Sequence, residues 1–316
     1  MVLTVAFING WTDAPNSVAA CVSTGVLPIK KALQISAIAD FIGSVSVGLL
    51  SGKVSERIIN LSSYGNDSDG YLISVFSAMS SVVIFAVISR CFGLPTSESH
   101  AVLAGIFGSS MHINGGFKNI NINDWINTGI GLIVSICVGY LVSYLLMKSV
   151  LLYIQKYNPV FDFKNIQILS GILTAFFHGA QDSQKFTAIA ISILCSKKTE
   201  INNLNIKITV LIALIISIGI LTSGEKIIKT VGNDLVKLNY LQGFSADVSG
   251  IVCILIFTLC GYPLSTTHVK TSAIMGAGSV DGEINRKTAS ELITSWVVTF
   301  PFCAALSYII TRILIK

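Results

Sequence analysis

Residues 7–20 read FINGWTDAPNSVAA, and residues 176–190 read FFHGAQDSQKFTAIA. Each stretch places a carboxylate, Asp13 or Asp182, inside an otherwise apolar run, three residues after a glycine. A charge at membrane depth is expensive, so it needs a partner or a function. The same uncommon arrangement in both halves of one chain predicts a membrane protein built from two copies of one unit.

Further matches support this duplication. FSA occurs at 76–78 and at 244–246, an offset of 168 residues, and Asp182 follows Asp13 at an offset of 169. Three more residues recur at the offset of 168, namely Pro95, Ser97 and His100 as Pro263, Ser265 and His268. Self-similarity at a fixed offset is the signature of an internal repeat. We expect a first repeat over 1–150, a linker over 151–164 and a second repeat over 165–316.

The composition agrees with a bilayer as solvent. Hydrophobic residues make up 52% of the 316 residues and charged residues 12%, and the mean hydropathy is +0.74. Soluble domains carry roughly a quarter charged residues. The apolar residues fall into about ten stretches of membrane-relevant length, near 2–24, 32–53, 71–92, 96–112, 125–150, 167–195, 206–230, 243–261, 264–280 and 288–314.

A helix satisfies its own backbone polar groups in lipid, and the short alternating segments of a membrane barrel are absent. We therefore expect an all-α, multi-pass protein of the cell membrane. Five stretches in each unit would turn the second copy upside down, the inverted-repeat plan of many secondary transporters with broken helices. If 96–112 and 264–280 only dip into the membrane and return, this parity has to be counted again.

The two acidic stretches suggest a cation site. Asn16 and Lys185 follow Asp13 and Asp182 by three residues, on the same face of a continuing helix. Gly10 and Pro15, and Gly179 in the second copy, favour local unwinding, and freed carbonyls with carboxylate and amide oxygens suit Na⁺. The alternative is a structural hydrogen-bond knot between helices. Lys185 could replace a cation beside Asp182 or could meet an anion directly.

Two further stretches, GLPTSESH at 93–100 and GYPLSTTH at 261–268, suggest an anion site. Glycine ends the preceding helix, and proline suits the first turn of the next one. A helix start exposes unpaired N–H groups and favours an anion. Neutral hydroxyl donors crowd both starts, from Ser97, Ser99, Ser265, Thr266 and Thr267. The alternative is ordinary N-capping by serine or threonine.

Other polar residues in apolar runs are weighed lower. His100 and His268 follow the hydroxyl clusters and could serve gating or proton linkage, although a lone helical histidine is usually a packed residue. Asp40 and Asp247 have no repeat partner of like type, and with Lys270 and Glu291 they could line a cavity or form pairs between helices.

As a set, these motifs resemble the duplicated signature of the inorganic phosphate transporter (PiT) family, and the resemblance extends over essentially the whole chain. It implies an inverted-repeat fold, symport of phosphate with Na⁺ or H⁺, no permanently bound cofactor and a homodimer. The implied cation site comprises Asp13, Asn16 and Asp182, with Thr12 and Gln181 where the family usually has asparagine before the aspartate. The implied substrate site comprises Thr96, Ser97, Glu98, Ser99, Ser265, Thr266, Thr267, Gln184 and Lys185.

Glu98 is a departure, because a small hydroxyl residue is frequent there in the family and a fixed negative charge repels an anion unless it is neutralised. A sulfate permease of the same fold is therefore an alternative. An intramembrane hydrolase using serine, histidine and aspartate is a more distant alternative. A hydrolase needs only one nucleophile activated by a base, whereas the serine and histidine elements occur twice here. A passive anion channel is the third. We expect no nucleic-acid partner, because the sequence shows no basic tail of the kind that binds nucleic acid.

Overall fold

The computed structural model describes residues 1–50, 53–61, 68–92, 96–117, 120–157, 162–195, 204–222, 228, 230–282 and 284–315. Every regular element within these residues is a helix, as predicted. The first half contains α1 (Val2–Ile8), α2 (Ala19–Ser23), α3 (Ile29–Leu50), α4 (Lys53–Leu61), α5 (Ser68–Phe92), α6 (Glu98–Ile113) and α7 (Ile122–Tyr157). The second contains α8 (Phe163–Cys195), α9 (Leu204–Leu221), α11 (Tyr240–Leu259), α12 (Thr266–Asp281) and α13 (Arg286–Leu314).

Each predicted apolar stretch overlaps one or more of these helices. Within the described residues, four helices are long and apolar enough to cross a membrane by length and composition, and they lie in α5, α7, α11 and α13. α6 and α12 have 16 residues each, which is about 24 Å of helix against a hydrocarbon core of about 30 Å. The number of crossings therefore stays a prediction.

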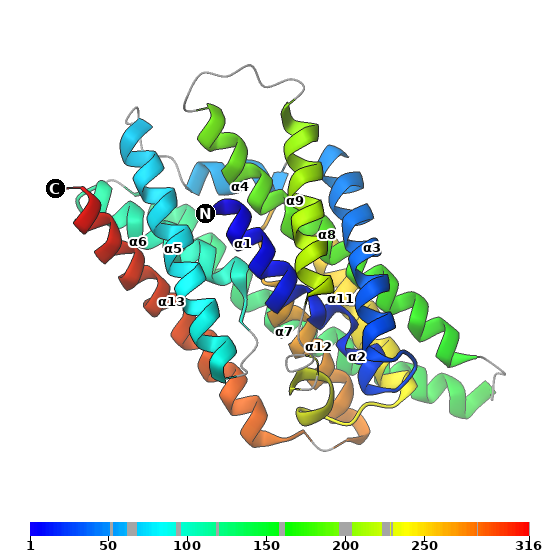
Figure 1. Ribbon diagram of the computed structural model, residues 1–316. Coiled ribbons are helices and arrows are strands. Elements are labelled where there is room, and N and C mark those ends of the chain that lie inside the picture. The colour runs from blue at the N-terminus through cyan, green and yellow to red at the C-terminus, as the bar shows by residue number, and fades with distance from the viewer. Residues whose placement is uncertain are drawn as a thin grey trace.

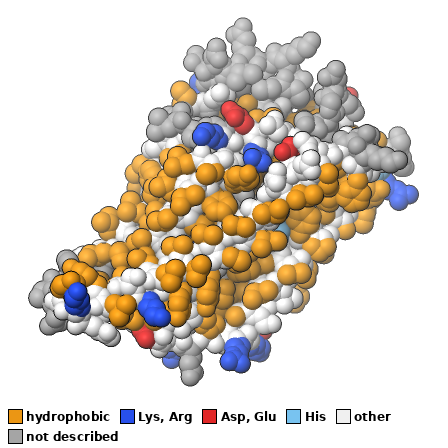
Figure 2. Space-filling view, turned by 180° about the vertical axis from the view of Figure 1, so that it is seen from behind, with side chains coloured by type: hydrophobic (Ala, Val, Ile, Leu, Met, Phe, Trp, Pro, Cys, Tyr) orange, Lys and Arg blue, Asp and Glu red, His pale blue; other side chains and the backbone are white. Residues whose placement is uncertain are grey.

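The outer surface suits lipid. Figure 2 shows hydrophobic side chains over the middle of one face, with charged side chains gathered toward its two ends. Long helices contribute large exposed apolar residues to the surface, among them Ile133 on α7 and Val297 and Ile313 on α13. A soluble protein rarely exposes so much contiguous apolar area.

Short α4 lies almost entirely between the predicted apolar stretches 32–53 and 71–92. It turns Val54, Ile58 and Leu61 inward and packs against α8.

The helices pack so that the two halves exchange partners (Figure 1). α6 contacts α5 and α13, and the matching helix α12 contacts α11 and α7. α3 packs on α8, while its counterpart α9 packs on α1. Each contact of a first-half helix thus matches a contact of its second-half counterpart. Two copies related by a two-fold axis would produce this pattern.

Four glycines at the centre follow the same exchange. A methyl group on any of them would overlap a backbone carbonyl of the helix that it faces, so only glycine permits the approach. The facing pairs are Gly10 with Ile216, Gly179 with Asp40, Gly219 with Phe7 and Gly43 with Phe176. When α1 is matched with α8 and α3 with α9, the pair Gly10–Ile216 corresponds to Gly179–Asp40. The pair Gly43–Phe176 corresponds to Gly219–Phe7 in the same way. Inversion of the second copy across the membrane stays a prediction.

Candidate functional site

The chain that carries Asp13 is irregular, as predicted. After α1 it forms a π-helical turn over Asn9–Asp13 and then a 3-10 turn over Ala14–Val18. Pro15 lies at the start of the second turn, where its ring and missing N–H oppose α-helical bonding. Asp13 and Asn16 are thus buried on backbone that departs from the α-helix.

Unwinding at Gly179 is a wrong prediction, because α8 runs unbroken from Phe163 to Cys195. Gly179 instead lets the backbone of α8 approach the carbonyl of Asp40 on α3. The second motif has no proline to remove a helical hydrogen bond. The two acids therefore sit on different backbones, one broken and one regular.

α6 and α12 begin at the two hydroxyl clusters. The Ser97 hydroxyl accepts a hydrogen bond from the backbone N–H of His100 over 3.1 Å, and the Ser265 hydroxyl accepts one from that of His268 over 3.0 Å. These two serines are N-caps, the alternative that the sequence left open. The remaining hydroxyls of the clusters are free to reach other groups.

The glycine before the second cluster ends α11 as predicted, since Gly261 adopts a φ of 75° and the N–H of Tyr262 returns to the carbonyl of Phe257. Pro263 does not lie in the first turn of α12, because the cap is Ser265, two residues later. Gly93 and Pro95 lie outside the described residues.

Thr267 joins the start of α12 to the first acidic motif. Its hydroxyl donates to the Asp13 carboxylate and lies 3.5 Å from the backbone oxygen of Thr96. The Asn16 amide donates to the same hydroxyl over 3.1 Å. A hydroxyl of the second half therefore completes a group of oxygens in the first half.

Lys185 makes the reciprocal connection. Its Nζ lies 2.6 Å from Asp182 Oδ1, 2.5 Å from the Ser99 hydroxyl and 2.8 Å from the backbone oxygen of Leu264. The first reading, an ion pair with Asp182, is met, while direct contact of Lys185 with an anion stays a prediction.

Glu98 is fully buried at the start of α6. Its Oε1 accepts hydrogen bonds from Thr12 and, over 3.0 Å, from Thr96. Thr12, expected among the cation ligands, is therefore already engaged by Glu98. Thr266, the counterpart of Glu98 in the second repeat, lies 3.5 Å from Asp182 Oδ2.

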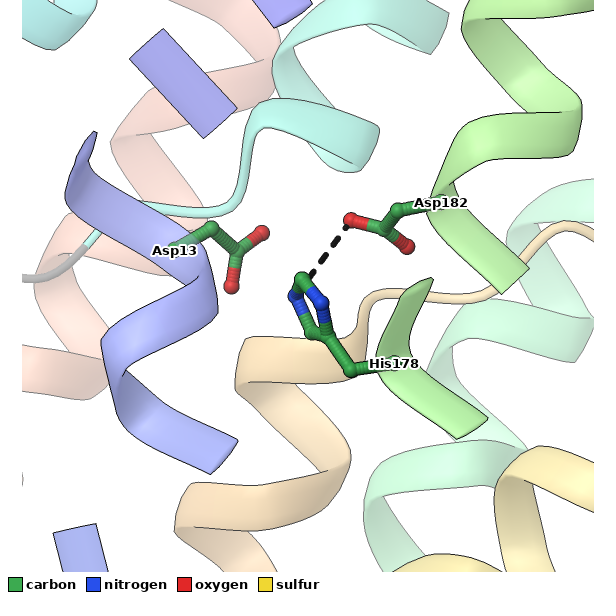
Figure 3. A group of neighbouring side chains, drawn as sticks. All are labelled: Asp13, His178 and Asp182. Atoms are coloured by element: carbon green, nitrogen blue, oxygen red, sulfur yellow. Dashed lines mark ion pairs between the residues drawn. The ribbon is translucent and has the colours of Figure 1, made fainter. Parts of the chain in front are cut away.

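His178 is a site residue that the sequence reasoning did not select. Figure 3 shows its ring between Asp13 and Asp182, and the nearest atoms of all three side chains lie within 4.8 Å of one another. Its Nδ1 lies 2.7 Å from Asp40 Oδ2 and its Nε2 3.6 Å from Asp182 Oδ2. Asp40 thereby fixes the orientation of the ring, as a carboxylate bonded to the other ring nitrogen does at many metal-binding histidines.

A signal for His178 was present in the repeat. Its counterpart at the offset of 169 is Asn9, which donates to Asp182 Oδ2 over 2.8 Å. A comparison of the repeats that is restricted to identical or similar residues does not detect the correspondence of Asn9 with His178.

The two glutamines of the second motif are bonded to groups other than the expected ions. The Gln181 amide accepts from Thr258 and donates to the backbone oxygen of Tyr262 over 3.3 Å, so α11 engages it. Gln184 donates to the backbone oxygen of Ala180 over 2.8 Å.

The lower-ranked charges form pairs between helices, one of the two readings left open. Lys270 is bonded to Asp247, which also accepts from Ser170 over 2.8 Å. Glu291 is exposed.

His100 on α6 and His268 on α12 contact each other through their rings. Their ring centroids lie 5.2 Å apart edge to face, and the His268 ring packs at a tilt with its centroid 4.4 Å from that of Trp296. This contact joins one helix of each half.

Several buried oxygens at the centre have no hydrogen-bond partner among the described residues. They are Oδ1 of Asn9, Oδ2 of Asp13, Oδ1 of Asn16, Oε2 of Glu98 and Oε1 of Gln184. Buried polar atoms are normally paired, and these carboxylate and amide oxygens can only accept. Nε2 of His178, which lies beside Asp13 and Asp182, also lacks a hydrogen-bond partner among the described residues. Carboxylate and amide oxygens are ligands for a hard cation, whereas the hydroxyls and first-turn N–H groups of α6 and α12 are donors for an anion.

Comparison with known proteins gives one consistent result. The model of the phosphate transporter family matches residues 9–163 and 154–307. A "Probable low-affinity inorganic phosphate transporter" of Bacillus subtilis is 30% identical over 96% of this chain and 92% of its own length. A protein of the same description from Rhizobium meliloti is 30% identical over 95% and 90%. A solved structure, "The sodium-dependent phosphate transporter", matches with a TM-score of 0.87 at 21% identity, over 99% of this chain and 96% of its own.

Proposed function

The chain belongs to the phosphate transporter family, and from this premise we propose that it is a secondary active symporter that carries inorganic phosphate across the cell membrane with Na⁺. It is a multi-pass membrane protein of a transporter family, not an enzyme. The name of the solved structure with the same fold supports Na⁺ as the coupling ion, with H⁺ as the alternative.

The observation that carries the proposal is the juxtaposition of unpartnered acceptors and available donors. Asp13, Asn16 and the Thr267 hydroxyl offer oxygens for the cation, next to the beginnings of α6 and α12. Thr266 and the first-turn N–H groups offer donors for the anion.

Electrostatics explains why the two ions would travel together. Asp13, Asp182 and Glu98 bring three carboxylates to one buried region, where the Lys185 ammonium pairs with Asp182 and the His178 imidazole lies between Asp40 and Asp182. Two unit charges 4 Å apart interact by about 4 kcal/mol at an effective dielectric constant of about 20. A cation bound about 4 Å from the anion would lower the cost of admitting that anion by about this amount, which is a coupling free energy between two sites.

Glu98 supports phosphate over sulfate. Its Oε2 is buried without a partner among the described residues. Near neutral pH, inorganic phosphate keeps at least one P–O–H group that can donate to a carboxylate, whereas sulfate has only acceptors. An unpaired buried acceptor costs about 1–3 kcal/mol, so the site would reject sulfate.

Alternating access would come from rocking of the two halves about the central glycine contacts. The contact between His100 and His268 would then change, which keeps the proposed gating role. The inverted relation of the repeats and the homodimer are part of this proposal and rest on the duplication and on the family resemblance.

A hydrolase is disfavoured by local geometry, because Ser97 and Ser265 accept from backbone N–H groups and the imidazole of His268 stacks on Trp296. The test is uptake of labelled phosphate by the purified protein in liposomes. With an inward Na⁺ gradient, phosphate should rise above its outside concentration. Equilibration without accumulation would indicate a channel instead.

A further inference from the structure

Three oxygen atoms surround the Lys185 ammonium in the way that oxygen ligands surround a bound cation. Lys185 is buried, with 2% of its side chain exposed, and has a carboxylate, a hydroxyl and a backbone carbonyl within 2.8 Å. Those three oxygens match the three donors of an ammonium group. They are also the oxygen types that bind a hard cation.

The repeat supplies the same three oxygens in the first half. At the repeat offsets of 168 and 169 residues, the three partners of Lys185 correspond to three residues of the group around Thr267. The equivalences are Asp182 with Asp13, Ser99 with Thr267 and Leu264 with Thr96. In both halves the hydroxyl comes from the opposite repeat, bonded to Lys185 in one and to Asp13 in the other.

The fourth member of each group differs. Lys185 corresponds to Asn16, a neutral amide whose Oδ1 has no partner among the described residues. Asp13 likewise keeps Oδ2 unpartnered there. In the second half, by contrast, the ammonium already uses Oδ1 of Asp182, the Ser99 hydroxyl and the carbonyl of Leu264. Of these two equivalent groups, the one in the first half is thus the one with unpartnered oxygens for an ion from solution, among the described residues.

We propose that Lys185 is a tethered cation that fills the second of two symmetry-related cation sites, leaving the Asp13 site as the exchangeable one. The inference rests on the proposed function and adds a stoichiometry to it. A fixed ammonium neutralises Asp182 without moving across the membrane, so each phosphate is carried with one cation fewer than the duplicated site could bind. At zero membrane potential, the limiting accumulation of phosphate is then smaller by one factor of the Na⁺ concentration ratio.

The test is the ratio of ²²Na⁺ to ³²P-phosphate taken up together by liposomes containing wild type or Lys185→Asn, which rebuilds the second half like the first. The variant should carry one more Na⁺ per phosphate, and Lys185→Arg should keep the wild-type ratio. Lys270→Asn is the matched control, since it removes another buried lysine paired with an aspartate on α11 and should leave the ratio unchanged. An unchanged ratio in active Lys185→Asn overturns the proposal.

Should Lys185→Asn insert without transporting, equilibrium binding of ²²Na⁺ to the purified protein decides. The variant should bind one more Na⁺ per chain than wild type, and equal binding contradicts the tethered cation. Failure of the parent proposal is distinguishable, because wild type would then show no Na⁺-driven phosphate uptake at all.

Discussion

Thr267 donates a hydrogen bond to the carboxylate of Asp13, although the two residues lie 254 positions apart and in different repeats. The bond ties the start of α12 to the irregular turn that follows α1. Because it joins the proposed anion and cation positions, it offers a direct route by which occupancy of one site affects the other.

Thr267→Val keeps the volume of the side chain and removes this hydroxyl. We expect the Na⁺ concentration for half-maximal phosphate uptake to rise about tenfold, since a hydrogen bond to a charged group is worth about 1.5–3 kcal/mol. Thr271→Val is the matched control one turn along α12, where the buried hydroxyl has no partner among the described residues. Equal Na⁺ dependence in both variants would refute the role of Thr267.

Asp13→Asn removes the charge of the exchangeable cation site. The protein should insert normally, while Na⁺-stimulated uptake falls on the order of a hundredfold, because about 3 kcal/mol of charge-assisted binding is lost. Membrane insertion and uptake are measured on the same preparation, with exposed Asp281→Asn as the control. Wild-type rates in Asp13→Asn would rule out this cation site.

Asp182→Asn should also abolish uptake, but with an additional loss of stability. It leaves the Lys185 ammonium without its carboxylate, and breaking a buried pair from one side costs about 3–5 kcal/mol. Thermal unfolding in detergent should therefore begin at a lower temperature than for Asp13→Asn. Equal thermal stability of the two variants would count against the ion pair.

Glu98→Gln tests the selectivity argument. The amide can donate to an anion, so competition by sulfate against labelled phosphate should strengthen about tenfold, as one hydrogen bond of about 1.4 kcal/mol changes sides. The inhibition constants of sulfate for wild type and variant give the answer. Unchanged or weaker inhibition by sulfate would separate Glu98 from selectivity.

Gly43→Ala tests the central packing of the repeats. The added methyl would overlap the carbonyl of Phe176, and forcing the helices apart should cost about 1–3 kcal/mol. Gly129→Ala is the control, because no atom lies within 4 Å of a methyl placed there, and helix propensity should make it slightly stabilising. Equal melting temperatures would mean that the crossing is looser than described.

Much of the site could be predicted from sequence because it is duplicated. Asp13 and Asp182 stood out as charges in apolar runs, and the hydroxyl clusters stood out at the starts of α6 and α12. What the repeat could not predict is that each hydroxyl serves the other half, as Ser99 does for Lys185, because this depends on how the halves dock.

Position along a helix explains other differences. Gln181 adjoins Asp182 in sequence, but successive helical residues are about 100° apart around the axis, so its amide meets α11. The role of Gly179 in close packing, rather than in unwinding, depends on α3 passing over it. His178 was passed over and Asp40 was ranked lower because neither has a repeat counterpart with the same side chain.

The most direct test of the symport claim is reciprocal driving. Liposomes containing the purified protein are given an inward phosphate gradient with equal Na⁺ on both sides, and entry of ²²Na⁺ is followed with the membrane potential clamped. A symporter must accumulate ²²Na⁺ under these conditions, and Asp13→Asn must not. Phosphate entry without any Na⁺ movement in wild type would contradict the coupling of the two ions at this site.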